Sequence, residues 1–177
     1  MKSAGYFSRV GTGNVVYQAN KPYTVMNPTY RNNDRLLIGV TSTAPAKTDF
    51  ATPPVSVPYA FTLNDTNTAS VQGLSVGRLA ASTNGCVYFE VFVIQGTATS
   101  AAVIFRELNS SGTAVATTYL NAYIPTSWSN RSYIYKPTNA GCVAVEVLLA
   151  PACDTSGTVT LTGTTSFADV RLSDMPI

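Results

Sequence analysis

Few residues in this chain are suited to acid–base or nucleophilic chemistry. The chain has no histidine, so the side chain that most often acts as a general base near neutral pH is missing. A glycoside hydrolase needs two carboxylates about 5–10 Å apart, and Glu90, Glu107 and Glu146 lie on predicted strands that could bring them together. Arg106 and Arg131 are available to pair with them, and ion pairing is the more frequent role of such acids. We therefore expect a protein that is not an enzyme.

Cofactor and metal sites are not expected either. Cys86, Cys142 and Cys153 lack zinc-site spacing, and no histidine can complete such a site. Three cysteines in a chain of this size do not form a disulfide framework, so we predict three thiols. Cys86 and Cys142 each open an apolar run after a glycine, which indicates small buried side chains. The segment 11–13 is no phosphate loop, because no Lys-Ser/Thr pair follows it.

Aromatic side chains are the other candidates for chemistry, because their faces pack against sugar rings. The chain holds ten tyrosines and one tryptophan. Filling the core is the more frequent role of such rings in a β-sandwich, and Trp128 is expected to pack beside the Pro-Thr-Ser turn before it. The better candidates for an exposed aromatic strip are Tyr119, Tyr123, Tyr133 and Tyr135.

Charge is scarce and unevenly placed. Charged residues make up 11% of the chain, against roughly 25% in an average protein. The many Thr, Ser and Asn residues indicate a polar, neutral surface, which is common where a protein lies against other proteins. Residues 1–35 hold five basic residues and one acid, a net charge of +4, so the remainder carries −2 of the total of +2. The basic residues form no run, so no nucleic-acid groove is predicted; the basic start of the chain can also be an accident of small numbers.

The elements that position these residues are predicted to be strands. Runs rich in Val, Ile, Tyr, Phe and Thr are separated by Gly, Pro, Asn and Ser clusters, and no segment has a sustained helical period. Short strands at this spacing predict an all-β fold, an antiparallel two-sheet jelly-roll β-sandwich. The expected strands are 35–41, 57–63, 74–81, 86–94, 101–108, 114–120, 131–136, 142–149 and 166–172, with weaker signals at 14–18 and 158–162.

Alternation along the strands predicts which faces are buried. Val143, Val145 and Val147 are expected to share one face of their strand. In 87–94 both faces are mostly apolar, which suits a central strand covered on each side. Glu90 shares its face with two aromatic residues, and is either a satisfied, partly buried carboxylate or part of a concave binding face. Residues 109–112 are expected to form the four-residue loop of a hairpin.

The first 25 residues differ from the rest. Residues 1–25 contain three glycines and no long strand, so we predict an irregular N-terminal arm there and one sandwich domain over 26–177. The proline-containing stretch 42–56 is expected to be an irregular connection or edge. The arm either docks on a partner or adds residues 14–18 to the protein's own sheet as an edge strand. The expected partner-binding residues are Lys2, Tyr6, Phe7, Arg9, Tyr17 and Lys21.

The second half of the chain shows a recognisable order of motifs. Trp128 precedes the strand in SWSNRSYIYKP; an Ala-Gly turn, CVAVEVLLA, a Gly- and Thr-rich turn and SFADVRL follow. With the Asn-Pro-x-aromatic segment that starts at Asn27, this order resembles galactose-binding-like jelly-roll domains of the carbohydrate-binding-module type, over residues 26–177. Similar domains occur in bacteriophage virion accessory proteins. Members of the family often hold calcium through acids at positions where this chain has Arg31 and Ala168, so calcium is not expected and Asp169 is predicted to be an ordinary satisfied acid.

Two function classes follow from the sequence. The first is a non-enzymatic structural or binding protein of a virus particle, a bacteriophage capsid decoration (cement) or tail component. Its expected partners are other virion proteins, through a homo-oligomer or lattice contacts, and no signal peptide or stretch of about 18 apolar residues indicates export or a membrane. It would be made in the host cytoplasm and located in the virion. The alternative is a carbohydrate-binding module, with a carbohydrate as partner.

Overall fold

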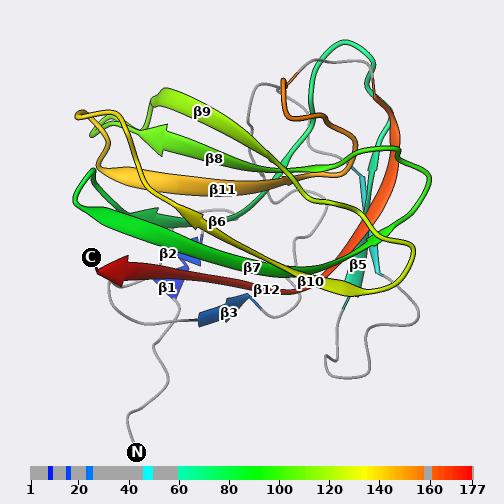
Figure 1. The fold of residues 1–177 in the computed structure, drawn as a ribbon. Coiled ribbons are helices and arrows are strands. Elements are labelled where there is room, and N and C mark those ends of the chain that lie inside the picture. The colour runs from blue at the N-terminus through cyan, green and yellow to red at the C-terminus, as the bar shows by residue number, and fades with distance from the viewer. Residues whose placement is uncertain are drawn as a thin grey trace, which may run out of the picture.

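Two β-sheets pack face to face in the computed structural model, which describes residues 8–9, 15–16, 23–25, 46–49, 60–157 and 161–176 (Figure 1). These residues contain no helix, and so none long and apolar enough to cross a membrane. The all-β, two-sheet jelly-roll sandwich is thereby confirmed. The strands are β1 (Ser8–Arg9), β2 (Val15–Val16), β3 (Tyr23–Val25), β4 (Ala46–Asp49), β5 (Ala60–Asp65), β6 (Leu74–Ala80), β7 (Gly85–Gln95), β8 (Ala102–Leu108), β9 (Ala114–Asn121), β10 (Ser129–Tyr135), β11 (Ala144–Ala150) and β12 (Gly163–Pro176).

The strand order defines two sheets. Sheet A has the order β1-β2-β6-β11-β8-β9, and sheet B has the order β10-β7-β12-β5-β4, with β3 also paired to β12. Neighbouring strands are antiparallel except for one parallel contact, at which Val16 of β2 lies beside Arg78 of β6. Strand β7 lies between β10 and β12, as expected for a central strand, but its second face is partly exposed and not covered as predicted.

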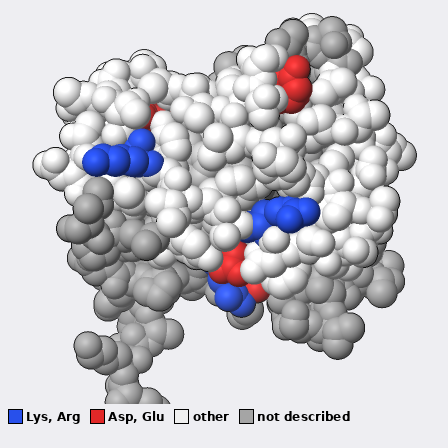
Figure 2. Space-filling view, viewed as in Figure 1, with Lys and Arg blue, Asp and Glu red and all other residues white. Residues whose placement is uncertain are grey.

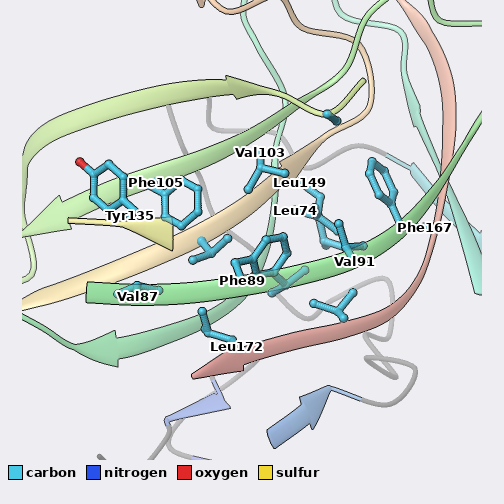
Figure 3. Packing of buried hydrophobic residues seen from close by; sticks show 14 of the residues in the cluster. Leu74, Val87, Phe89, Val91, Val103, Phe105, Tyr135, Leu149, Phe167 and Leu172 are labelled. Carbon is cyan, nitrogen blue, oxygen red and sulfur yellow. The ribbon is translucent and has the colours of Figure 1, made fainter. Parts of the chain in front are cut away.

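The core lies between the sheets and is built by alternation. Val87, Phe89, Val91 and Val93 of β7 are completely buried, and the residues between them are partly exposed. Figure 3 shows side chains of this cluster filling the space between the two layers. Each large apolar side chain buried in this way stabilises the fold by about 1.5–3 kcal/mol. Aromatic contacts of the core join Phe61 to Phe167, Phe89 to Phe105 and Tyr133, and Phe105 to both Tyr133 and Tyr135.

A second, smaller apolar cluster covers one end of sheet A from outside. It contains Ile104, Leu148 and Cys153, among others, with Tyr119 packed against it. Asp65 holds the loop after β5, because its carboxylate accepts hydrogen bonds from backbone N–H groups of that loop at 2.8 and 3.2 Å. This end of the outer face of sheet A is therefore closed, whereas the outer face of sheet B carries polar side chains.

Several predicted boundaries shift in the structure. The stretch 42–56, expected to be an irregular connection or edge, includes β4, which pairs with β5 at an edge of sheet B. The hairpin loop after β8 has five residues, 109–113, not four, and Oδ1 of Asn109 accepts hydrogen bonds from the N–H groups of Ser111 and Thr113. Val143 precedes β11 and is 49% exposed, while Val145 and Val147 face the core as predicted. The strand expected at 35–41 lies outside the described residues.

Within residues 1–25, the structure describes three short strands. Strand β2 pairs with β1 and contacts β6, and β3 pairs with β12, so these segments lie on the chain's own sheets. Residues 15 and 16 of the segment 14–18 lie in β2 between β1 and β6, so the choice between an edge strand and a docking arm stays a prediction. The division into an arm and a domain at residue 25 stays a prediction. Of the expected partner-binding residues, Arg9 lies in β1, and Lys2, Tyr6, Phe7, Tyr17 and Lys21 lie outside the described residues.

Candidate functional site

A patch of polar, aromatic and aliphatic side chains covers three neighbouring strands on the outer face of sheet B. The residues of β7 that point away from the core supply its middle, and outward residues of β10 and β12 flank them. Because strands lie about 4.8 Å apart and alternate residues about 7 Å apart, the patch measures about 10 Å by 14 Å. We call this patch the Glu90 surface. Its three rows are Ile134 with Tyr88 and Ser173, Ser132 with Glu90 and Arg171, and Asn130 with Phe92.

Glu90 is the centre of the patch. Its Oε2 accepts a hydrogen bond from the Tyr88 hydroxyl at 3.1 Å and lies 3.9 Å from Nη1 of Arg171. Its Oε1 accepts a hydrogen bond from the side-chain amide of Asn130. The Glu90 side chain is 16% exposed. Glu90 is thus the satisfied, partly buried carboxylate that the sequence allowed, and it also lies on an outer face.

A β-bulge in β12 places the arginine of this patch. Ala168 lies opposite Phe92 and Arg171 lies opposite Glu90, so three steps along β12 match two along β7. Asp169, within the bulge, has a φ of +47°. The extra residue exchanges the two faces of the strand, because side chains alternate with a period of two. Without it Val170 would oppose Glu90 and Arg171 would point into the core.

The charges of the patch are coupled. Nη2 of Arg171 lies 2.6 Å from Oδ2 of Asp169, and the same guanidinium faces Glu90. Two carboxylates and one guanidinium give this group a net charge of −1. Burial, followed by the hydrogen bond and the charge of Glu90, raises the pKa of Tyr88 above its ordinary value of 10. The Tyr88 hydroxyl therefore remains a hydrogen-bond donor at neutral pH.

Apolar groups border the polar centre. Ile134 is 64% exposed, although it lies in the middle of a strand. Phe92 is half-buried, so part of this residue remains accessible to solvent. Figure 2 shows how few Lys, Arg, Asp and Glu side chains the face in view carries. Ligand sites in proteins typically combine apolar contact area with a few fixed polar groups, and the Glu90 surface provides both.

The four tyrosines proposed as an exposed strip do not form one. Tyr123 is 66% exposed just after β9, but Tyr135 is buried and stacks on Phe105, with ring centroids 4.6 Å apart. Tyr133 packs against the core and its hydroxyl donates to a backbone carbonyl. Tyr119 packs on the outer cluster of sheet A. Alternation along β10 turns both of its tyrosines inward, which corrects the expectation of exposure.

The three strand glutamates face different parts of the molecule. Glu90 lies on the outer face of sheet B. Glu107 is completely buried and accepts hydrogen bonds from Tyr135 and from the loop after β10. Glu146 lies on the outer face of sheet A, where Nη1 of Arg106 is 3.1 Å from its Oε2. No two of these three glutamates therefore form the carboxylate pair of a glycoside hydrolase. Arg106 forms an ion pair with one of them, Glu146, as expected.

The remaining candidate residues have structural surroundings. The three cysteines are free thiols, as predicted; Cys142 and Cys153 are buried, whereas the burial expected for Cys86 is wrong, since it is partly exposed at the start of β7. Trp128 is half-buried in the loop before β10. In the part of the chain that the structure describes, no group of three or more His, Cys, Asp or Glu side chains is arranged to hold a metal ion. Asp169, the acid compared with family calcium ligands, pairs with Arg171.

Sequence reasoning found only the middle strand of the Glu90 surface. It placed Glu90 on one face with Tyr88 and Phe92, and that grouping is correct. It did not select Asn130, Ser132 or Ile134, although alternation along β10 would have put these three on one face. Arg171 gave no signal, because its position depends on the bulge.

Comparisons with known proteins show the fold. No family model and no curated protein matches the chain. The enzymatically active domain of tailspike protein 4 from bacteriophage CBA120 aligns with a TM-score of 0.55 and 13% identity, over 76% of this chain and 18% of that chain. The xylan-binding domain CBM22-1 of Paenibacillus barcinonensis Xyn10C has a TM-score of 0.49 and 10% identity, over 75% and 82%. A family 30 carbohydrate-binding module has a TM-score of 0.49 and 12% identity, over 72% of this chain and 83% of that chain. At these identities the likeness is one of fold alone, and this chain spans less than a fifth of the tailspike chain.

Proposed function

We propose that this protein binds carbohydrate without acting on it, and that the Glu90 surface holds the saccharide. The observation that carries the proposal is the placement of a carboxylate, an amide and a guanidinium beside exposed apolar area on one sheet face. Sugar hydroxyls both donate and accept hydrogen bonds, and Glu90, Asn130 and Arg171 supply acceptors and donors within one patch. The carbohydrate-binding alternative from the sequence is thereby preferred to the virion role.

Fixed geometry favours this role for the patch. Glu90 is held by Tyr88 and Asn130, and Arg171 is held by Asp169, so the polar groups are oriented before a ligand arrives. Preorganised groups lose little conformational entropy on binding. Phe92 and Ile134 offer apolar contact for the C–H faces of a sugar ring.

The absence of catalysis is part of the proposal. Retaining and inverting glycosidases both need two carboxylates on either side of the scissile bond. Beside the Glu90 surface the second acid, Asp169, has its side chain 7% exposed and its Oδ2 paired with Arg171. Such an acid supports the orientation of Arg171, and it is poorly placed to act as a nucleophile or as a general base.

The test is affinity electrophoresis through gels that contain soluble polysaccharides, followed by calorimetry with the oligosaccharide of any that retards the protein. We expect wild-type protein to be retarded by at least one neutral polysaccharide. Glu90→Ala and Asn130→Ala are expected to weaken binding about tenfold or more, equivalent to about 1.4 kcal/mol. Ser110→Ala, an exposed change in the hairpin loop between β8 and β9, is the matched control and should bind as wild type.

Two results would contradict the proposal. The first is that no polysaccharide in a broad panel of plant, fungal and bacterial polymers retards the protein. The second is binding that Glu90→Ala and Asn130→Ala leave unchanged, which would place the saccharide elsewhere. Product analysis after long incubation tests the non-catalytic part, because released sugar would contradict it.

A second candidate function is a structural role in a bacteriophage particle, as a capsid decoration (cement) or tail component. It is supported by the low charge of the chain and by the fold-level likeness to a domain of a phage tailspike chain. The test is mass spectrometry of purified phage particles whose genome encodes this chain. Its presence at a fixed copy number would favour this role, and its absence from intact particles would exclude it. A virion protein can also bind sugars, so both candidates can hold together.

A further inference from the structure

Strand β9 forms a free edge of sheet A. Among the described residues it is the last strand in the sheet order, and the pairing that they give it is with β8. Figure 1 shows β9 at the outer margin of its sheet. An unprotected edge strand presents unpaired backbone N–H and C=O groups, which bind readily to another strand.

The sequence of β9 lacks the residues that usually block edge pairing. Proteins protect their edges with charged side chains, proline or short strands. Strand β9, AVATTYLN, has eight residues and contains no charged residue, proline or glycine. The other strands that end the two described sheet orders contain charge: Arg9 in β1, Lys47 and Asp49 in β4, and Arg131 in β10. A register shift affects only the start of β9, and the pairing from Ala116 to Asn121 is regular.

The backbone groups on the free side can be assigned. The N–H of Ala122 donates to the carbonyl of Ala101, so it points toward the strand before β9. Because the direction alternates along an antiparallel strand, the N–H and C=O groups of Thr117 and Tyr119 point away from β8. The Thr117 side chain is exposed and that of Tyr119 is half-buried. Two successive hydrogen-bonding positions are thus directed outward at this edge.

We infer that β9 pairs antiparallel with β9 of a second copy of this chain. In a two-fold pairing each strand lies against its own sequence, so a charged residue at the axis would meet the same charge; β9 contains no charged residue. A two-fold axis at Thr117 sets this residue opposite its own copy and Tyr119 opposite Val115. Thr–Thr and aromatic–β-branched pairs are favourable cross-strand pairs. The pairing also covers Val115, which is 36% exposed.

The pairing has a functional consequence, which rests on the proposed function. The two-fold axis of an antiparallel edge pair is perpendicular to the sheet, so both copies present the same face to the same side. The two Glu90 surfaces then point in one direction. Two weak sites on one polymer surface bind more strongly together than either site alone.

The test measures mass and does not depend on a sugar. Size-exclusion chromatography with multi-angle light scattering on the full chain is expected to give twice the chain's mass at millimolar concentration. Thr117→Lys places like charges across the axis and is expected to give the mass of one chain, with an unchanged circular dichroism spectrum. Ser110→Lys adds the same charge in the exposed hairpin loop and should remain a dimer. Thr117→Val keeps the strand neutral and should also remain a dimer.

Hydrogen exchange supplies a readout that needs no variant. The amides of Thr117 and Tyr119 are expected to exchange more slowly at millimolar than at low micromolar concentration. A monomeric wild-type protein at millimolar concentration, or a dimer that Thr117→Lys leaves intact, would overturn the inference. Equal exchange at both concentrations would also overturn it. Failure of saccharide binding with an intact dimer would instead contradict the proposed function alone.

Discussion

The hydroxyl of Tyr135 donates a 2.7 Å hydrogen bond to Oε1 of Glu107, so that β10 of one sheet is tied to β8 of the other. Burial raises the pKa of Tyr135 to about 12, with a further rise from Glu107 that Thr118 partly offsets. The hydroxyl therefore stays protonated and donates throughout the ordinary pH range. Glu107 also accepts hydrogen bonds from the backbone N–H groups of Thr138 and Asn139 at 2.8 Å each. One buried carboxylate thus holds both sheets and the loop after β10.

We predict that Tyr135→Phe lowers the free energy of unfolding by about 1.5–3 kcal/mol, because it removes a hydrogen bond to a buried charged group. The ring stack on Phe105 is kept, so packing changes little. Tyr133→Phe is the matched control, since its hydroxyl donates to the neutral backbone carbonyl of Asn121. Its expected loss is about 0.5–1.5 kcal/mol. Urea denaturation measures both, and an equal loss in the two variants would show that the charge of Glu107 adds nothing.

Because of Glu107, we also predict that the stability of the protein decreases as the pH is lowered. Burial by itself would raise its pKa, but hydrogen bonds from Thr138, Tyr135 and Asn139 lower it below the ordinary value of 4.5. The folded state then binds this proton more weakly than the unfolded state does. The contribution of Glu107 is present above pH 4.5 and is lost as pH falls through its folded pKa. We expect the free energy of unfolding to fall less steeply with acidification in Glu107→Gln than in wild type.

Asp65 provides a control, because its effect on the pH dependence of stability should have the opposite sign. Burial raises its pKa above the ordinary 3.8, and the hydrogen bonds from Asn67 and Gln72 offset only part of this rise. Its contribution therefore favours the folded state at low pH and is lost as pH rises through its folded pKa. Asp65→Asn should make the acid loss of stability steeper. Urea denaturation from about pH 7 to about pH 3 measures the free energy of unfolding of both variants and of wild type. If this free energy changes with pH in the same way in all three proteins, the roles given to Glu107 and Asp65 are wrong.

Gly163 is predicted to tolerate no side chain. It has a φ of +132°, and an added Cβ would lie 2.7 Å from the backbone nitrogen of Ala98. Gly163→Ala should cost about 2 kcal/mol or more, because a strained φ alone costs about 1–3 kcal/mol. At Gly85, at the start of β7, an added Cβ meets nothing within 4 Å. Gly85→Ala should stay within about 0.5 kcal/mol of wild type, and similar melting temperatures for the two variants would contradict the prediction.

Thiol reactivity should separate the cysteines. The reactive species is the thiolate, and burial raises the pKa of Cys153 to about 12 and also raises that of Cys142. In the folded protein a disulfide reagent at mildly alkaline pH should therefore modify Cys86 alone within minutes, and Cys86→Ser should abolish this fast phase. In denaturant three thiols should react. A count below three there would reveal a disulfide bond and contradict the free thiols of the structure.

The fold was predictable because alternation and turn residues agree along most of the chain. In β11 the two valines Val145 and Val147 alternate with Glu146 and both face the core, as the sequence pattern indicates. Strand β10 was harder, since its two faces both carry large apolar residues. Tyr133 and Tyr135 turn inward and Ile134 outward, and alternation alone does not say which face meets the core.

The candidate site could be predicted only in part for a related reason. Glu90 lies on a regular strand, so its neighbours in the sequence indicated its face. Arg171 reaches the same face only because one extra residue is accommodated after Ala168. A bulge depends on pairing between strands that are distant in the sequence, and no local pattern marks it. Asn130 depends on pairing as well, since it joins Glu90 from another strand.

The position of β12 sets the order in which the protein can fold. This strand, late in the chain, lies between β7 and β5 and also pairs with β3, so sheet B has a gap until residues 163–172 have been synthesised. Phe167, Val170 and Leu172 complete the core, which until then is open on one side. Contacts between residues about a hundred positions apart form slowly, because a long loop must close first. A nascent chain that pauses before this strand leaves apolar residues of the inner faces uncovered, which is the condition under which folding intermediates aggregate.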